Sequence, residues 1–139
     1  MKNFVVGFAF SPDGKEIALL LKDHPENLAG KLNGLGGGVE DGESYEEAMA
    51  REFREESGGA EIPLKGWRQF GVLRKPKFSV AFFRADAPTR FEFDQTRSEP
   101  ANWYPLDSLM QRTNLAPNLM TMIVAAMDTK GGYVQITAD

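Results

Sequence analysis

Residues 37–59 of this chain read GGVEDGESYEEAMAREFREESGG. Ser44 and Glu47 are spaced as in a capping box, in which the serine hydroxyl accepts from a helix-start amide and the glutamate reaches back. A helical pattern of apolar residues continues from there to Phe53. The two glycines after Ser57 are a common signal for the end of a helix. The stretch therefore predicts a helix that starts at Ser44 and follows a glycine-rich loop.

Three glutamates of this predicted helix share one face. Glu52, Glu55 and Glu56 are spaced i, i+3 and i+4, and at about 100° per residue they point the same way. Like charges at these spacings repel by roughly a few tenths of a kcal/mol per pair, so a cation is expected to offset the repulsion. On composition alone, a solvated acidic face is the alternative. The glycine-rich run at residues 34–38 favours a site, because glycines bring bare carbonyls close to a ligand.

The predicted donor set consists of oxygen atoms. Carboxylates and a backbone carbonyl suit Mg²⁺ or Mn²⁺ better than Zn²⁺. The chain has no Cys and one His, which argues against a zinc site built on soft ligands. Other motifs do not fit this loop, because Val39 breaks the G-x-G-x-x-G spacing and no Gly-Lys-Ser/Thr follows it.

The same stretch resembles the Nudix box, whose pattern is G, five residues, E, seven residues, then R-E-apolar-x-E-E-x-G-apolar. Every fixed position of that pattern is matched, by Gly37, Glu43, Arg51, Glu52, Glu55, Glu56 and Gly58. The departure is Gly59, where the family usually carries an aliphatic residue, and we expect it to loosen the helix packing without affecting catalysis. The resemblance implies an α/β fold, the Nudix α/β/α sandwich with a mixed β-sheet, over nearly the whole chain.

The resemblance also implies a chemistry. Nudix enzymes use a divalent ion, Mg²⁺ or Mn²⁺, and water to hydrolyse a nucleoside diphosphate linked to a further group X. It assigns Glu52, Glu55 and Glu56 as metal ligands, with the Gly37 carbonyl as a fourth. Either Glu52 or Glu56 serves as general base; family members differ, and the sequence leaves both open.

The remaining residues of the motif are expected to build and frame the site. Glu43 and Arg51 are predicted to hold the loop and the helix together through a charge-assisted bond. Their removal would damage the site without either side chain touching the reacting atoms. The glycines Gly36, Gly37 and Gly38 are grouped with the substrate-binding residues.

Many Nudix enzymes recruit another acid from outside the box. Glu99, four residues before Trp103, lies in the region where family members often carry it, and we name it as a further metal ligand. Asp94 and Glu92 are rivals, and a plain surface carboxylate is the alternative for each. For Trp103 we predict core packing, with base stacking as the alternative.

Two asparagines are candidates for reading a base. Asn33 lies in a run similar to the entry to the box in animal-type 8-oxo-dGTP hydrolases, where an Asn helps to read the damaged base; a tight Asn-Gly turn is the alternative. Asn118 resembles an Asn used for guanine recognition in bacterial MutT-type enzymes. It also stands where a helix cap would, which is the role we predict. The recognition aspartates of the animal-type enzymes are not evident near Trp103.

Three functional hypotheses follow. The first is a Mg²⁺-dependent hydrolase of (deoxy)nucleoside triphosphates to monophosphate and pyrophosphate, a role that includes the removal of oxidised nucleotides; a short chain without added domains fits it. The second is a Nudix hydrolase of ADP-ribose, a dinucleoside polyphosphate or a nucleotide sugar. The third is a nucleotide-binding sensor without catalysis, which the intact box glutamates argue against.

Composition sets the class of protein. A length of 139 residues with 42% hydrophobic content predicts one globular domain over residues 1–139. The net charge of −4 gives no broad attraction to duplex nucleic acid or to membranes, and no apolar run is long enough to span a bilayer. We therefore expect a cytoplasmic enzyme, monomer or homodimer, whose partner is a small nucleotide.

The rest of the chain predicts alternating strands and helices without repeats. Residues 22–32 form a polar loop that we expect to line an opening. The predicted strands are 4–10, 16–21, 67–74, 78–84 and 102–106, with a short apolar segment at 91–93, a helical turn near 105–109, a helix over 117–127 and an edge strand at 133–136.

Overall fold

The computed structural model describes residues 1–128 and 132–138. Its centre is an 8-stranded sheet of order β3-β2-β1-β6-β5-β8, with β4 paired to β1 and β7 paired to β2. The β1–β6 and β5–β8 pairs are parallel and the others antiparallel, so the sheet is mixed. The strands are β1 (Lys2–Phe10), β2 (Glu16–Leu21), β3 (Leu32–Asn33), β4 (Leu35–Gly38), β5 (Arg68–Arg74), β6 (Phe78–Asp86), β7 (Ala101–Pro105) and β8 (Val134–Thr137).

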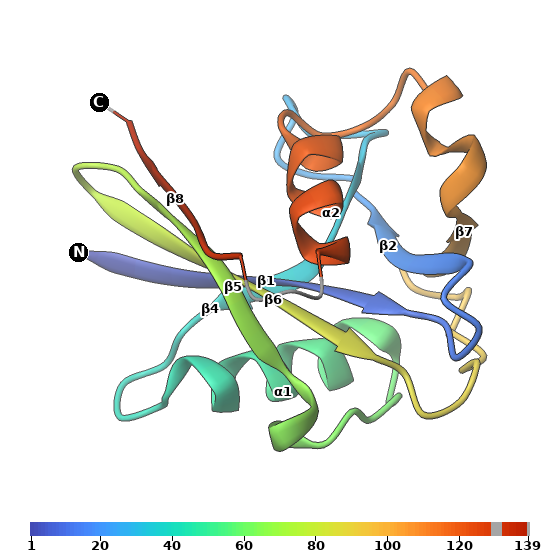
Figure 1. The fold of residues 1–139 in the computed structure, drawn as a ribbon, viewed down its shortest axis with the longest axis horizontal. Coiled ribbons are helices and arrows are strands. Elements are labelled where there is room, and N and C mark those ends of the chain that lie inside the picture. The colour runs from blue at the N-terminus through green and yellow to red at the C-terminus, as the bar shows by residue number, and fades with distance from the viewer. Residues whose placement is uncertain (129–131, 139) are drawn as a thin grey trace.

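Helices cover both faces of this sheet. Helix α1 (Tyr45–Ser57) lies below it in Figure 1, and α2 (Leu119–Met127) lies above it. Two short 3₁₀ helices, η1 (Leu64–Gly66) and η2 (Leu106–Gln111), follow α1 and β7. The predicted α/β class and the mixed sheet are confirmed.

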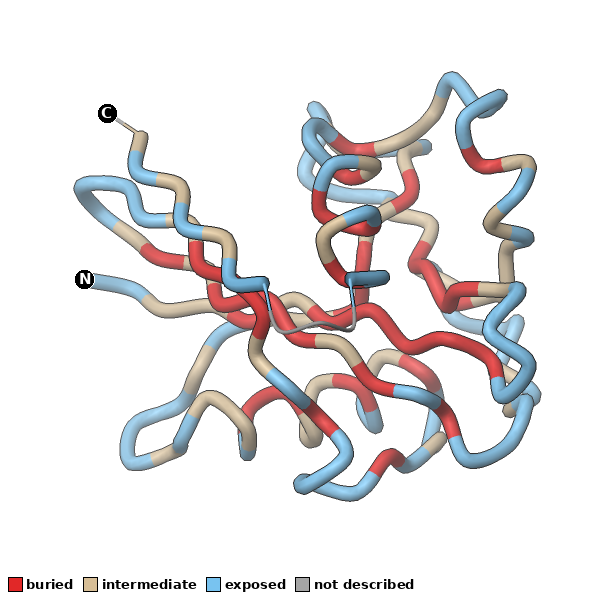
Figure 2. Tube along the Cα trace, in the orientation of Figure 1, coloured by how far each residue is buried: buried red, intermediate tan, exposed pale blue. Residues whose placement is uncertain are grey.

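Strand β1 divides the core into two layers. Val5 and Ala9 are buried in the cluster that contains residues of α1, whereas Phe8 and Phe10 are buried in the cluster that contains residues of α2. This is the period of two that a strand imposes on its side chains. Figure 2 shows the resulting buried stretch through the middle of the molecule. The sheet is therefore covered on both sides, and α1 is held in a fixed position against β1 and β4.

Helix α1 forms as its capping residues predict. The Glu47 amide donates to Ser44 Oγ at 3.1 Å, and the Ser44 amide donates to Glu47 Oε1 at 2.9 Å. At the other end Gly58 takes the left-handed conformation with φ 81°, which a residue without a Cβ adopts at little cost. Met49 and Phe53 are fully buried beneath the sheet, and Glu52 and Glu56 lie on the adjoining side of the helix, where they reach the backbone of β4.

Replacing Ser44 with Ala is expected to lower the free energy of unfolding by about 1 kcal/mol, because it leaves a helix-start amide without its acceptor. Urea denaturation measures the loss. Ser44→Asp should restore most of it, since aspartate also caps helices well. An Ala variant as stable as the parent would show that the cap does not contribute to the free energy of unfolding.

The glycine-rich run is more regular than the sequence suggests. It forms β4, whose Gly36 pairs with Val6 of β1. A Cβ on Gly36 would lie 1.9 Å from the Val5 carbonyl oxygen, so only glycine lets the two backbones approach this closely. The loop before the box is thereby fixed to the central strand of the sheet.

The structure adds detail to two predicted segments. Residues 91–93, predicted as a short apolar segment, form no strand, and Phe91 and Phe93 pack as partly buried rings against the layer that contains α1. Helix α2 begins at Leu119 rather than at 117, because Asn118 has φ 66° and makes no side-chain capping bond. The predicted cap at Asn118 is therefore wrong in its hydrogen bond: asparagine stands there in the left-handed conformation, which it tolerates better than most residues.

Within residues 1–128 and 132–138, no helix combines the length and the apolar character that crossing a bilayer requires.

Candidate active site

Glu56 is the most perturbed acid of the site. It extends from the last turn of α1 toward β4, where its Oε1 accepts from the Gly36 amide at 2.7 Å. Burial, opposed by that bond and by the Lys22 charge and reinforced by Glu52 and Glu99, raises the pKa of Glu56 to about 7. A carboxyl group with a pKa near neutral can exchange a proton under working conditions, which suits a general base or a ligand whose charge changes on cation binding.

Glu52 lies one turn earlier and faces the same backbone. A Cβ on Gly37 would lie 2.5 Å from its carboxyl carbon, so the glycine leaves the space in which the Glu52 carboxylate sits. Burial is the largest effect on this acid and raises its pKa, against the lowering influence of Arg51. Two acids with raised pKa values therefore flank the Gly36–Gly37 backbone.

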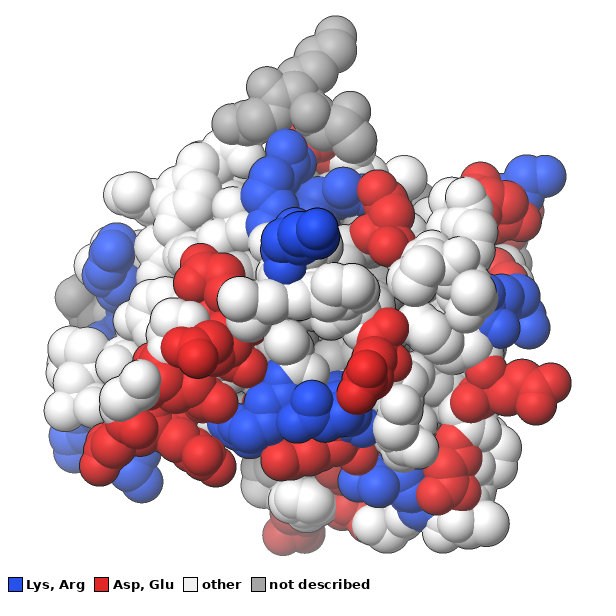
Figure 3. Space-filling model, turned by 90° about the horizontal axis from the view of Figure 1, so that it is seen from below, with Lys and Arg blue, Asp and Glu red and all other residues white. Residues whose placement is uncertain are grey.

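Arg51 joins the loop to the helix. Its Nε donates to Glu43 Oε2 at 2.7 Å, and a second nitrogen donates to Glu43 Oε1 at 3.0 Å and to the Gly38 carbonyl at 2.9 Å. The remaining nitrogen donates to Glu52 at 2.9 Å and to Glu55 at 3.3 Å. The Arg51 guanidinium holds the pKa of Glu43 below its usual range. Figure 3, seen from the side of α1, shows acidic side chains gathered around basic ones on this face.

Glu55 and its neighbours do not yet meet at one point. The Glu55 side chain is 56% exposed and leans toward Arg51, whereas Glu56 is directed to Gly36. In the described part of the chain, the His and carboxylate groups whose donor atoms lie within 4.8 Å of one another are Asp23, His24 and Glu99. Glu52 and Glu55 are bonded to Arg51 in this arrangement, whereas Glu56 is bonded to Gly36.

The residues present fit a hard divalent ion. Burial is the main cause of the raised pKa values of Glu52 and Glu56, and neighbouring carboxylates raise them further. A cation beside these acids would stabilise their charged forms. Because Gly37 has no side chain, the backbone of β4 lies directly against the Glu52 carboxylate. Carboxylates beside backbone carbonyls are the donor set that Mg²⁺ and Mn²⁺ prefer.

Glu99 comes to this site from the loop before β7. Its Oε1 accepts from Lys22 Nζ at 3.2 Å, and its Oε2 accepts from the amides of Asp23 at 2.8 Å and His24 at 3.3 Å. Only 12% of its side chain is exposed, and its charge raises the pKa of Glu56. Glu99 is thus held beside Lys22, and its charge acts on Glu56.

The rival acids of that loop lie elsewhere. Asp94 accepts from the amide and the hydroxyl of Thr96 at 2.9 and 2.6 Å, a local turn beside Gly58, and these bonds lower its pKa. Glu92 is exposed. Trp103 is partly buried and donates from Nε1 to the Phe91 carbonyl at 2.8 Å, as a core-packing residue does.

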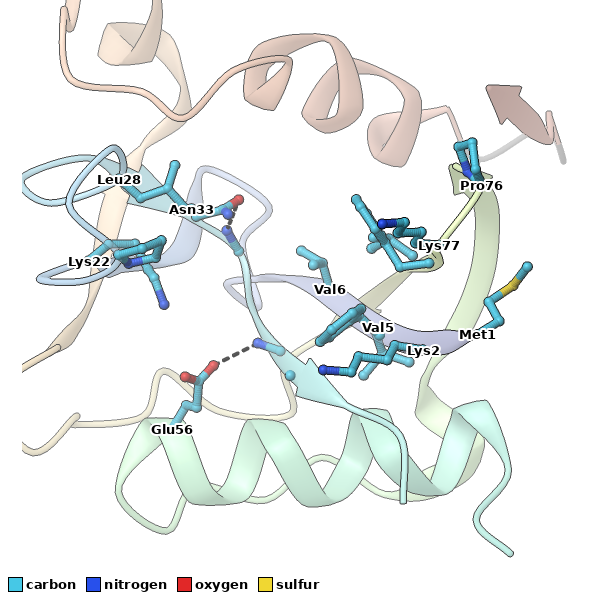
Figure 4. A pocket seen from close by; sticks show the side chains of 17 residues that line it. Met1, Lys2, Val5, Val6, Lys22, Leu28, Asn33, Glu56, Pro76 and Lys77 are labelled. Atoms are coloured by element: carbon cyan, nitrogen blue, oxygen red, sulfur yellow. Dashed lines mark hydrogen bonds between the residues drawn. The ribbon is translucent and has the colours of Figure 1, made fainter. Parts of the chain in front are cut away.

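A cavity of about 1060 Å³ opens beside these acids. Glu56, Gly36 and Gly37 form one part of its wall, and Asn33 and Lys22 form another. The Asn33 side-chain oxygen accepts from the Gly34 amide at 2.9 Å, and the residue lines the cavity (Figure 4). The other lining residues are mostly apolar: Met1, Lys2, Phe4, Val5, Val6, Pro25, Leu28, Gly34, Pro76, Lys77, Phe78 and Val80.

Asn118, a candidate for reading a base, is exposed and does not line this cavity. Lys22 is the functional residue that sequence reasoning missed, because a lysine directly after an apolar strand is most often solvated. Only its pairing with the distant Glu99 shows that it faces the site.

The comparisons with known proteins agree with this geometry. The NUDIX domain model matches residues 2–124. The chain belongs to the Nudix family. One curated relative is the NAD-capped RNA hydrolase NudC of Vibrio cholerae, 33% identical over 98 residues, which is 68% of this chain. That match covers 35% of NudC, so the chain corresponds to about a third of the relative's length.

Solved Nudix structures share the fold. A MutT structure from work on Aliivibrio salmonicida and Vibrio cholerae superposes with a TM-score of 0.70 at 23% identity, covering 90% of this chain and 96% of that one. The NUDIX domain of Shewanella oneidensis NrtR, complexed with ADP ribose, gives a TM-score of 0.71 at 20% identity, covering 89% and 84%. At such identities the likeness concerns the Nudix fold and leaves the substrate open.

Proposed function

We propose that this Nudix protein is a Mg²⁺- or Mn²⁺-dependent pyrophosphohydrolase that cleaves a nucleoside diphosphate linked to a further group. The observation that carries the proposal is the pair of partly buried acids, Glu52 and Glu56, set against the Gly36–Gly37 backbone, with Glu56 in the wall of a cavity of about 1060 Å³. A cavity of this size accommodates a nucleotide-sized ligand.

The residues divide the work of hydrolysis among them. A bound divalent ion supplies charge neutralisation at the pyrophosphate and activates water. Glu52, Glu55 and Glu56, with the Gly37 carbonyl and Glu99, would hold that ion. Water attacks one phosphorus, the bridging P–O bond breaks, and Glu52 or Glu56 accepts the water proton. Arg51 and Glu43 hold the glycine-rich strand and α1 together during this step.

The first substrate candidate is a (deoxy)nucleoside triphosphate, cleaved to the monophosphate and pyrophosphate, including oxidised nucleotides. Asn33 supports it, because its side chain lines the cavity and offers its amide nitrogen to an acceptor on a base.

The second candidate is a pyrophosphate that joins two larger groups, as in a dinucleotide or ADP-ribose. The relative at 33% identity is a hydrolase of NAD-capped RNA, and one structural neighbour holds ADP ribose. The mostly apolar cavity, which extends on both sides of the glycine-rich strand, supports it as well (Figure 4).

A substrate panel with Mg²⁺ tests the proposal. It contains canonical and 8-oxo dNTPs, ADP-ribose, NAD, a diadenosine polyphosphate and a UDP-sugar, with monophosphate, phosphate and pyrophosphate as readouts. Hydrolysis of any member at the pyrophosphate, lost on chelation of the metal, supports the proposed chemistry and names the class. Binding without turnover across the panel would instead favour a nucleotide sensor.

Replacing Asn33 with Ala is expected to change the preference among bases more than the maximal rate. The reason is that a lost hydrogen bond to one base costs roughly 1 kcal/mol for that base alone. The measurement is kcat/KM for each base of the preferred substrate class. A variant that lowers every base equally would show that Asn33 is a turn residue whose bond to Gly34 shapes the loop.

A further inference from the structure

Three lysines gather at the side of the cavity away from Glu56. Lys2 begins β1, and Lys75 and Lys77 stand at the turn between β5 and β6. Strands β1 and β6 are neighbours, and the Lys2 amide donates to the Lys77 carbonyl at 3.2 Å. Lys2 and Lys77 line the cavity, and Lys75 lies 6.0 Å from the centre of the Phe78 ring. We call these three residues the lysine mouth.

The lysine mouth has no acidic partner in the described part of the chain. All three residues are exposed, and none forms an ion pair within 4.0 Å there. The protein as a whole is acidic, with a net charge of −4, so a local excess of positive charge stands out against it. Such a patch at the edge of a cavity attracts an anionic part of a ligand.

Beneath the lysine mouth lies a pair of aromatic rings. Phe4 and Phe78 line the cavity, and their centroids are 6.1 Å apart in an edge-to-face arrangement. Both are only partly buried, so part of each ring borders the cavity. Aromatic rings bordered by lysines are the combination with which proteins bind single-stranded nucleotides, because bases stack on the rings while cations contact the phosphates.

The lysine mouth and the Asn33 region lie on opposite sides of the glycine-rich strand. Figure 4 shows Lys22, Leu28 and Asn33 on one side of this strand, and Lys2 and Lys77 on the other. Glu56 lies on the side of Lys22 and bonds to Gly36 of the strand. Gly36 pairs with Val6, four residues along β1 from Lys2. At about 3.3 Å per residue this is a separation of roughly 13 Å, enough for a second nucleotide beyond the pyrophosphate.

We propose that the lysine mouth and the Phe4–Phe78 pair bind a second nucleotide of the substrate, joined to the first through the pyrophosphate that the acids of α1 face. This inference rests on the proposed pyrophosphohydrolase function and narrows its substrate class. The first nucleoside lies toward Asn33, the pyrophosphate lies at Glu52 and Glu56, and the second nucleotide stacks on the rings with its phosphate near the lysines.

The test is a triple variant, Lys2→Ala, Lys75→Ala and Lys77→Ala, with a Lys65→Ala variant as the matched control. Lys65 is equally exposed but does not line the cavity. We expect the triple variant to lower kcat/KM about tenfold for a diadenosine polyphosphate, because phosphate contacts are lost. Its kcat/KM for ATP should stay within about twofold, because ATP has no second nucleotide. Equal losses for both substrates, or none for either, would overturn the proposal.

A binding measurement separates this inference from the proposed function. A diadenosine polyphosphate whose bridging oxygens are replaced by methylene groups is not cleaved, so calorimetry of this analogue and of the matching methylene analogue of ATP compares ligands with and without the second nucleotide. We expect the dinucleotide analogue to bind more tightly, with an advantage that falls as salt rises and disappears in the triple variant. A parent protein that hydrolyses no pyrophosphate but keeps this advantage would overturn the function alone. Hydrolysis without the advantage would overturn the second-nucleotide site.

A further substrate distinguishes the two sources of such a ligand. A short single-stranded RNA with a 5′-NAD cap presents the same second nucleotide at the end of a polymer, whereas a diadenosine polyphosphate presents it free. If the RNA is preferred and the preference depends on the three lysines, the ligand is an RNA end. Preference for the free dinucleotide with the same lysine dependence makes it a small molecule. Lysine-independent turnover of both contradicts the proposal.

Discussion

Replacing Glu56 with Gln is expected to lower turnover with Mg²⁺ by about 10³-fold, the effect of removing a general base or a charged ligand. The fold should survive, because the Gln side-chain oxygen can still accept from the Gly36 amide, as Glu56 Oε1 does at 2.7 Å. Steady-state kinetics measure the loss, and Glu61→Gln, at an exposed position outside the site, is the control. Near-normal turnover of Glu56→Gln would remove this residue from the proposed machinery.

The same substitution should stabilise the protein without metal at alkaline pH. Burial raises the pKa of Glu56 from 4.5 to about 7, so between these values the folded state binds more protons than the unfolded state. The free energy of unfolding therefore falls as pH rises from about 4.5 to 7, by at most roughly 3 kcal/mol, and levels off above that range.

Glutamine carries no charge to bury, and the pH-dependent loss should be absent from the variant. Urea denaturation at pH 5 and pH 8, with chelator present, measures the effect. Added Mg²⁺ should then stabilise the parent more than the variant, since a ligand that binds only the folded state raises its stability. Parallel pH profiles for the two proteins would contradict the burial of this carboxyl group.

Replacing Arg51 with Ala is expected to have the largest effect on stability among the residues of the site. Its side chain is 16% exposed and is bonded to Glu43 at 2.7 Å and to Glu52 at 2.9 Å, with the Gly38 carbonyl as a further acceptor at 2.9 Å. Removal leaves partly buried carboxylates unpaired, which costs about 3 kcal/mol. Activity should fall with it, because the glycine-rich strand loses its tie to α1.

Arg54 on the same helix is the matched control for Arg51. It is 51% exposed, and its contact with Glu61 is 4.0 Å long, so Arg54→Ala should change stability by less than about 0.5 kcal/mol. The double variant Arg51→Ala with Glu43→Gln should recover part of the loss, because one unpaired charge is removed. Denaturation curves decide the matter: equal losses at Arg51 and Arg54 would show that the contacts of Arg51 are energetically unimportant.

Much of this protein was accessible from local sequence. The capping residues Ser44 and Glu47 and the glycines after Ser57 act within one or two helical turns, so the ends of α1 follow from neighbouring residues alone. The spacing of the box glutamates places them on one helix face for the same reason. The family and the α/β class followed from that stretch. The strands predicted from apolar runs were correct to within two residues, but β3 and β4 were not predicted.

Contacts between distant segments were decided by the tertiary structure. The bond from Gly36 to Glu56 and the pair of Lys22 with Glu99 join residues far apart in the chain. Neither pairing has a local signal, because each depends on how β4 meets β1 and on where the loop before β7 returns. The predicted side-chain cap at Asn118 was wrong, because this residue adopts the left-handed conformation and its side chain makes no capping bond.

The sequence by itself determined the helix, its acidic face and the family, because those depend on interactions between near neighbours. The raised pKa of Glu56 could be obtained only from the tertiary structure, because the burial that causes it depends on how the sheet and the helix pack together. Only it placed Lys2, Lys77, Phe4 and Phe78 around one cavity, because the parallel pairing of β1 with β6 brings the two ends of these strands side by side.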